Sequence, residues 1–98
     1  MAEAKTFSVE LAREAQRDLE GLAPDIQRNV AIEIQRWLSQ DPFRAVKTRS
    51  KRLSGFVPPV YRLRIGDYRA YYRILPPDKV VILAIFPKRD SQRWLPRS

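Results

Sequence analysis

The sequence predicts an α+β fold of the order β-α-α-β-β-β, with a helical hairpin packed on one face of a largely antiparallel four-stranded sheet. Two segments with period-two alternation flank a Gly-Asp pair at 66–67, and an earlier region has helical periodicity. A continuous apolar run fills residues 80–86. Helices that cover one face of an antiparallel sheet form a stable pair of layers. The 98 residues suffice for a single domain spanning 1–98.

The N-terminal part predicts one short strand followed by two helices. Residues 5–10 alternate, with Phe7 and Val9 on one face. Gly21 is suited to the end of the first helix, and Pro24 to the first turn of the second. Apolar residues at helical spacing form two stripes, one of Leu11, Ala15, Leu19 and Leu22 and the other of Ile26, Val30, Ile34, Trp37 and Leu38.

The C-terminal part predicts a connector and then three strands. Residues 42–59 are a polar, basic connector with turns before the strands. Residues 60–74 read as a hairpin, and residues 80–86 are apolar throughout, as in a covered central strand. Pro87 ends that last strand.

The hairpin has a defined register because its turn has only two residues, Gly66-Asp67. Period-two alternation then divides its side chains between two faces. The face expected against the core carries Tyr61, Leu63, Ile65, Tyr68, Ala70, Tyr72 and Ile74. The face expected to be open carries Arg62, Arg64, Arg69, Tyr71 and Arg73.

This cationic face has two interpretations. Like charges that oppose each other on a sheet repel, as Arg64 and Arg69 would. A solvated face can tolerate that repulsion, and an anion such as phosphate can relieve it. The charge of the whole chain favours an anionic partner, because net charge is +8 and the residues from Pro42 onward contain 14 Lys and Arg but three Asp.

Several classes of protein are excluded or disfavoured. Without cysteine there is no disulfide framework and no thiolate zinc site, and without histidine the commonest general base is missing. No cofactor motif is found. The N-terminus lacks the pattern of a signal peptide, and no apolar run approaches the length needed to span a bilayer. We therefore expect a cytoplasmic protein without a membrane partner.

Three segments together resemble the RelE/ParE superfamily of bacterial toxins: K-R-L-S-G at 51–55, Y-R-L-R-I-G-D-Y-R-A-Y-Y-R-I at 61–74 and V-V-I-L-A-I-F-P-K-R at 80–89. The resemblance covers nearly the whole chain and implies a RelE-like fold. For RelE-type members it implies a toxin of a type II toxin–antitoxin system that cleaves messenger RNA in the ribosomal A site and so inhibits translation.

The resemblance also implies site residues. Arg62 and Arg64 occupy the positions of two basic strand residues that are usually lysines in the best-known member. Arg69 matches the arginine of the G-x-Y-R motif, Arg89 matches the arginine after the last strand, and Trp94 stands one residue from the position of the C-terminal tyrosine. As RNA-binding residues we expect Lys47, Lys51, Arg52, Arg73 and Trp94.

The chemistry of such a site can be argued from the residue types. Cleaving RNA with its own 2′-OH, without a metal, builds charge on the phosphate, and arginines can stabilise that charge. Arginine cannot serve as the base. The candidates for that role are Lys88, Lys51 and Tyr71, since neighbouring cations favour their deprotonated forms, with Asp90 as a weaker one.

Two alternatives stay open at this point. One is a ParE-type toxin that inhibits DNA gyrase by binding, and the other is an inactive relative that only binds its antitoxin. All three readings imply a cognate acidic antitoxin as partner, and the first adds the ribosome and mRNA.

Overall fold

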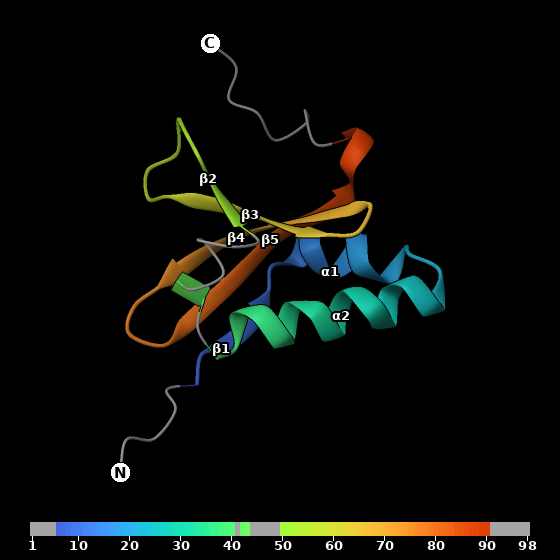
Figure 1. Cartoon of the computed structure of the whole chain (residues 1–98), viewed down its shortest axis with the longest axis horizontal. Coiled ribbons are helices and arrows are strands. Elements are labelled where there is room, and N and C mark those ends of the chain that lie inside the picture. Colours follow the sequence, from blue (N-terminus) through green and yellow to red (C-terminus); the bar gives the residue numbers. More distant parts are fainter. Residues whose placement is uncertain (1–5, 41, 44–49, 91–98) are drawn as a thin grey trace.

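The computed structural model describes residues 6–40, 42–43 and 50–90 (Figure 1). The main elements of the described residues are two helices and five strands. In order they are β1 (Ser8–Leu11), α1 (Arg13–Glu20), α2 (Pro24–Leu38), β2 (Ser50–Leu53), β3 (Val60–Ile65), β4 (Tyr68–Leu75) and β5 (Lys79–Pro87).

The five strands form one sheet in the order β1-β5-β4-β3-β2. Neighbouring strands are antiparallel except for β1 and β5, which run parallel. The predicted α+β class and the largely antiparallel sheet are confirmed, but the predicted count of four strands is wrong. The additional strand, β2, lies within the segment predicted to be a connector.

The sequence pattern does not predict β2, because S-K-R-L has one apolar residue and no alternation. This edge strand is stabilised by its contacts with the neighbouring strands and not by its own sequence pattern. It pairs with β3 from Ser50–Leu63 to Leu53–Val60. In addition, the Tyr72 hydroxyl on β4 donates a hydrogen bond of 2.7 Å to the Ser50 hydroxyl.

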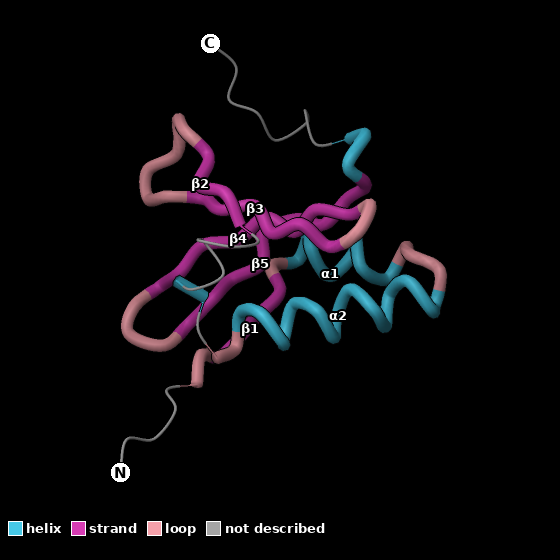
Figure 2. The backbone as a smooth tube through the Cα atoms, viewed as in Figure 1, coloured by secondary structure: helices cyan, strands magenta, loops and turns pink. Residues whose placement is uncertain are grey.

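Both helices lie on the same side of the sheet (Figure 2). The predicted stripes face the sheet except at Leu11, which pairs with Ile82 in β1 because the first helix begins only at Arg13. The half-buried residues Leu11, Leu22, Ile26 and Trp37 pack around the core. Pro24 lies in the first turn of α2, as predicted. The main core between the layers contains Ala15 and Leu19 of α1, Val30, Ile34 and Leu38 of α2, and Leu63, Ile65, Ala70, Tyr72, Val80, Ile82 and Ile85 of the sheet.

A carboxylate covers the edge of β5 beyond the end of β1. The last β1 residue, Leu11, lies opposite Ile82, so the amides of β5 that follow have no partner strand on that side. Asp18 of α1 accepts a hydrogen bond of 2.9 Å from the Ile85 amide. The helix therefore satisfies a backbone donor that the short first strand cannot reach.

The register of the β3–β4 hairpin is as predicted. Ile65 pairs with Tyr68, and the pairing continues through Arg64–Arg69 to Tyr61–Tyr72. Gly66 has a φ of 55°, and no residue other than glycine has a positive φ in the described chain. A positive φ at the first central residue alone fits a type II′ turn, whose twist matches that of the flanking strands.

Among the described residues, no helix has both the length and the apolar character to cross a membrane. The same part of the chain contains no group of three acidic side chains placed to hold a metal ion.

We predict that Gly66→Ala lowers the free energy of unfolding by about 1–2 kcal/mol, because an L-residue is strained at this φ even though the added Cβ has open space around it. Chemical denaturation measures the change. Gly21→Ala is the matched control. Its φ is −79° and its added Cβ would make ordinary contacts at 3.6 Å, so it should be neutral or slightly stabilising. Equal losses in both variants would contradict the assignment of strain to the turn.

Because the phenol of Tyr72 is buried, we predict that the protein loses stability at alkaline pH. Burial raises the pKa of its phenol to about 12, against 10 in the unfolded chain, while the hydrogen bond with Ser50 acts in the opposite direction. Stability is therefore full below about pH 10 and falls as the pH rises through about 12, because the unfolded chain releases its proton first. The loss should reach roughly 2–3 kcal/mol. Unfolding measured against pH should show a shallower fall in Tyr72→Phe, and identical profiles would refute the prediction.

Candidate functional site

The face of the sheet turned away from the helices, here called the outer face, carries the predicted cationic cluster. Strand pairing places Lys51 opposite Arg62, and Arg62 opposite Tyr71. In the next row toward the turn, Arg64 lies opposite Arg69. Four basic residues from three neighbouring strands therefore share one surface.

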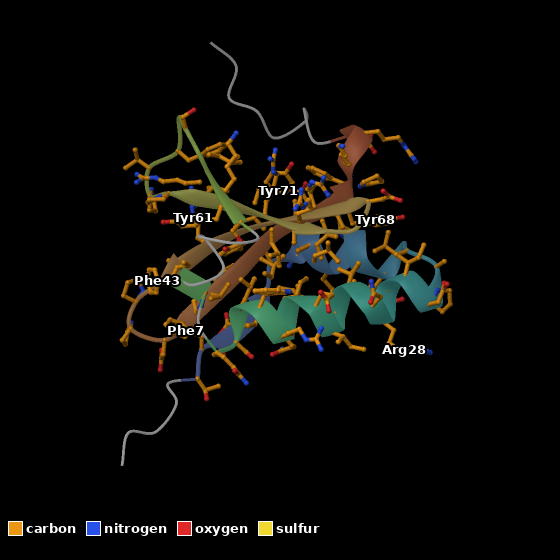
Figure 3. The ribbon with its side chains drawn as sticks, viewed as in Figure 1. Phe7, Arg28, Phe43, Tyr61, Tyr68 and Tyr71 are labelled. Atoms are coloured by element: carbon orange, nitrogen blue, oxygen red, sulfur yellow. The ribbon has the colours of Figure 1, made fainter. Side chains whose placement is uncertain are left out.

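The outer face is not fully open, and that expectation is wrong. A second, smaller core lies on it, and Figure 3 shows Tyr71 on the side of the sheet away from the helices. Tyr71 is 1% exposed and packs on Phe86, with ring centroids 5.1 Å apart. This apolar floor consists of Leu53, Val60, Tyr71, Ala84 and Phe86, with Phe56 and Leu83 packed against it.

Sequence reasoning missed most of this floor. The run at 80–86 is apolar at every position, so alternation could not indicate which of its residues face outward. Leu53 and Phe56 lie in the segment predicted to be a connector. The available signal was the isolated leucine of K-R-L-S-G, whose place beside Val60 becomes clear only once β2 is paired.

Arg69 differs from the other cations because its side chain is 7% exposed. Its Nη1 donates hydrogen bonds of 2.9 Å to the Gly66 carbonyl and 2.8 Å to the Tyr68 carbonyl. Burial lowers the pKa of Arg69 from its ordinary value, and the guanidinium groups of Arg62 and Arg64 lower it further. The group stays charged in a protein.

The other strand cations are more accessible. Arg64 and Lys51 are exposed, whereas Arg62 and Arg73 are half-buried. The Nε of Arg73 is shielded from solvent and has no hydrogen-bond partner among the described residues. Arg52 pairs with Tyr61 and so projects from the opposite face of β2, away from this cluster.

The turn that follows β5 lies beside the hairpin turn. The Lys88 amide donates a hydrogen bond of 2.7 Å to the Asp67 carbonyl, and the side chains of Lys88 and Arg89 are exposed. Asp90 is half-buried. Two further predicted RNA-binding residues, Lys47 and Trp94, lie outside the described residues.

A cavity of about 310 Å³ lies on the other side of the hairpin turn, between that turn and α2. Asp25 and Asp67 line it together with Asn29 and Tyr68. Its two carboxylates make it unsuitable for an anion. The outer face is instead a cationic surface over a rigid apolar floor, which is suited to the phosphates of an extended polyanion.

Comparisons with known proteins agree with this architecture. The sequence model of the family described as "ParE toxin of type II toxin-antitoxin system, parDE" matches residues 9–92. A putative toxin RelE1 of Methanocaldococcus jannaschii is 32% identical over 85 residues, which cover 87% of this chain and 92% of the relative.

Two solved structures are also similar. One is the toxin–antitoxin complex RelBE2 from Mycobacterium tuberculosis, with 31% identity, a TM-score of 0.69, and coverage of 84% of this chain and 98% of that chain. The other is the RelE–RelB complex from Pyrococcus horikoshii OT3, with 26% identity, a TM-score of 0.68, and coverage of 85% and 96%. The chain therefore belongs to the RelE/ParE family of toxins of type II toxin–antitoxin systems.

Proposed function

We propose that this toxin is a ribosome-dependent endoribonuclease that cleaves messenger RNA and so inhibits translation. The observation that carries the proposal is the outer face, where Lys51, Arg62, Arg64 and Arg69 gather on one rigid surface with Lys88 and Arg89 on the turn that follows β5. The relatives that bear the RelE name support it.

In the reaction we propose, the 2′-oxygen of the RNA attacks the adjacent phosphorus and the 5′-oxygen leaves. The 5′-oxygen takes up a proton from water as it leaves, so the products are a 2′,3′-cyclic phosphate and a 5′-hydroxyl end. Negative charge develops on the phosphate oxygens in the transition state, and prearranged cations stabilise that charge. Arg62, Arg64 and Arg89 would supply the cations, since the planar guanidinium matches two phosphate oxygens at once.

The proton of the 2′-hydroxyl needs an acceptor. Tyr71 is too deeply buried to reach the RNA backbone, so we assign it to the floor that supports the arginines. Lys88 is exposed at the end of the cluster and is the base that we propose, with exposed Lys51 as the second candidate. A charged lysine has no free electron pair and cannot accept a proton, so only its neutral fraction could act as the base. Much of the rate would therefore come from in-line orientation of the RNA by the ribosome.

The remaining predicted residues would bind RNA without taking part in bond breaking. Lys47 and Arg73 would contact phosphates, as would Lys51 where Lys88 is the base, and Trp94 would stack on a base. Arg52 projects from the opposite face of β2, so it would contact phosphates only where the RNA passes around the edge of that strand. Since the ribosome is the site of action, we also propose that the toxin works in the cytoplasm.

An acidic antitoxin is the proposed protein partner. The two similar structures are complexes of RelE-type toxins with their antitoxins. A basic face over an apolar floor suits an acidic segment that carries apolar side chains and folds on binding. Such a segment would cover the cations and block access of RNA.

Binding to DNA gyrase is the second candidate function. The family model that matches residues 9–92 is described by the ParE name, and ParE-type toxins of this superfamily inhibit gyrase. Inhibition by binding would require no general base. This favours the second function, because the only candidate bases that the outer face offers are lysines.

Cleavage on programmed ribosomes tests the proposal. Purified toxin should cut mRNA at defined positions, and Arg89→Ala should lower the rate by about 10²-fold or more if Arg89 stabilises the transition state. Arg28→Ala is the control because Arg28 projects from α2 away from the sheet (Figure 3), and its rate should equal that of the wild type. Primer extension maps and quantifies the cuts.

A supercoiling assay with the same protein separates the alternatives. If mRNA stays intact and supercoiling is inhibited, the toxin acts as a gyrase inhibitor and the nuclease proposal is wrong. Intact mRNA and normal supercoiling, with antitoxin binding retained, would indicate an inactive relative.

A further inference from the structure

We propose that Arg69 is a positioning residue: it fixes the β3–β4 turn, to which the turn at 88–90 is hydrogen-bonded, and so holds Lys88 and Arg89 beside the outer face. This assignment deepens the proposed nuclease function and rests on it where activity is concerned. It differs from a direct role for Arg69 at the scissile phosphate, which the G-x-Y-R motif predicts.

Two sets of hydrogen bonds meet in the hairpin turn, one from Arg69 and one from the main chain of the turn at 88–90. Nη1 of Arg69 donates to the carbonyls of Gly66 and Tyr68, which flank Asp67 on both sides. The Asp67 carbonyl between them accepts the Lys88 amide at 2.7 Å. The guanidinium therefore fixes the two peptide groups around the carbonyl to which the next turn is attached.

The environment of Arg69 supports holding rather than binding. Its exposure of 7% contrasts with exposed Arg64 directly opposite, and both N–H groups of its Nη1 serve main-chain carbonyls. Burial and two neighbouring guanidinium groups disfavour the charge, as the lowered pKa of Arg69 indicates. Hydrogen bonds from a charged donor are worth more than neutral ones, and the two bonds to the main-chain carbonyls offset this penalty.

The turn at 88–90 needs such an anchor. It is a single short turn that follows the last strand, and a turn of this length has few internal hydrogen bonds. Its exposed cations can stabilise a transition state only if they are held in place, because misplacement by about 1 Å can cost a large part of the rate. The bond from the Lys88 amide to the hairpin turn supplies that constraint.

Amide hydrogen exchange tests the structural part without reference to any activity. In Arg69→Ala the protection of the Lys88 amide should fall by at least about tenfold, relative to the Ile74 amide at the far end of β4. Arg64→Ala removes the opposite cation on the same face and is the matched control, so it should leave that ratio unchanged. Arg69→Gln keeps two of the three methylene groups and one donor nitrogen, and its ratio should lie between the two.

Two results would overturn the structural part. One is an unchanged ratio of Lys88 to Ile74 protection in Arg69→Ala and Arg69→Gln. The other is the same loss in Arg64→Ala, which would assign the effect to charge on the face instead of to the bond. Arg69→Gln keeps the test informative if the alanine variant does not fold.

A double-mutant cycle tests the functional part. If Arg69 acts through the 88–90 turn, Arg69→Ala combined with Arg89→Ala should slow mRNA cleavage about as much as the larger single change. If Arg69 contacts the phosphate itself, the two fold-losses should multiply, and the positioning role would be refuted. Absence of cleavage by the wild type would refute the nuclease proposal alone, because the exchange measurement does not depend on it.

Discussion

The left-handed backbone of Gly66 is the constraint on which the rest of the structure depends. A two-residue turn with φ of 55° at its first position sets the pairing of β3 with β4. A slip of one residue would move every side chain of one strand to the other face. The turn thus decides that Leu63, Ile65 and Tyr72 enter the main core while the arginines lie opposite. The core and the candidate site are two consequences of one register.

The outer face combines repulsion between cations with a rigid apolar support. Arg64 faces Arg69 across the pair, and Arg62 lies beside them, so their charges disfavour one another. Tyr71 and Phe86 fill the space beneath and hold the strands that bear the charges. A surface of this kind binds an anion with little reorganisation, because its cations are already gathered and their mutual repulsion is relieved on binding.

Sequence reasoning reached the register, the helical stripes and the grouping of the arginines because each depends on local periodicity or on one turn. It could not predict features that depend on contacts between residues far apart in the sequence. The strand β2 exists through its pairing with β3 and the Tyr72–Ser50 bond, and the cover that Asp18 gives to β5 joins residues 67 positions apart. Arg64 and Arg69 look equivalent in the alternation of the two hairpin strands, yet Arg69 is buried and bonded to main-chain carbonyls of the turn, whereas Arg64 is exposed.

The salt dependence of RNA binding tests the central claim, that the register gathers cations into a phosphate-binding face, most directly. The affinity of the purified toxin for a single-stranded RNA oligonucleotide should fall with salt at a log–log slope of roughly −3, as expected for about four phosphates. Replacing Arg62 and Arg64 together by alanine should bring the slope to roughly −1.5, since two of those contacts are removed. A slope near zero, or one that the double variant leaves unchanged, would contradict the account.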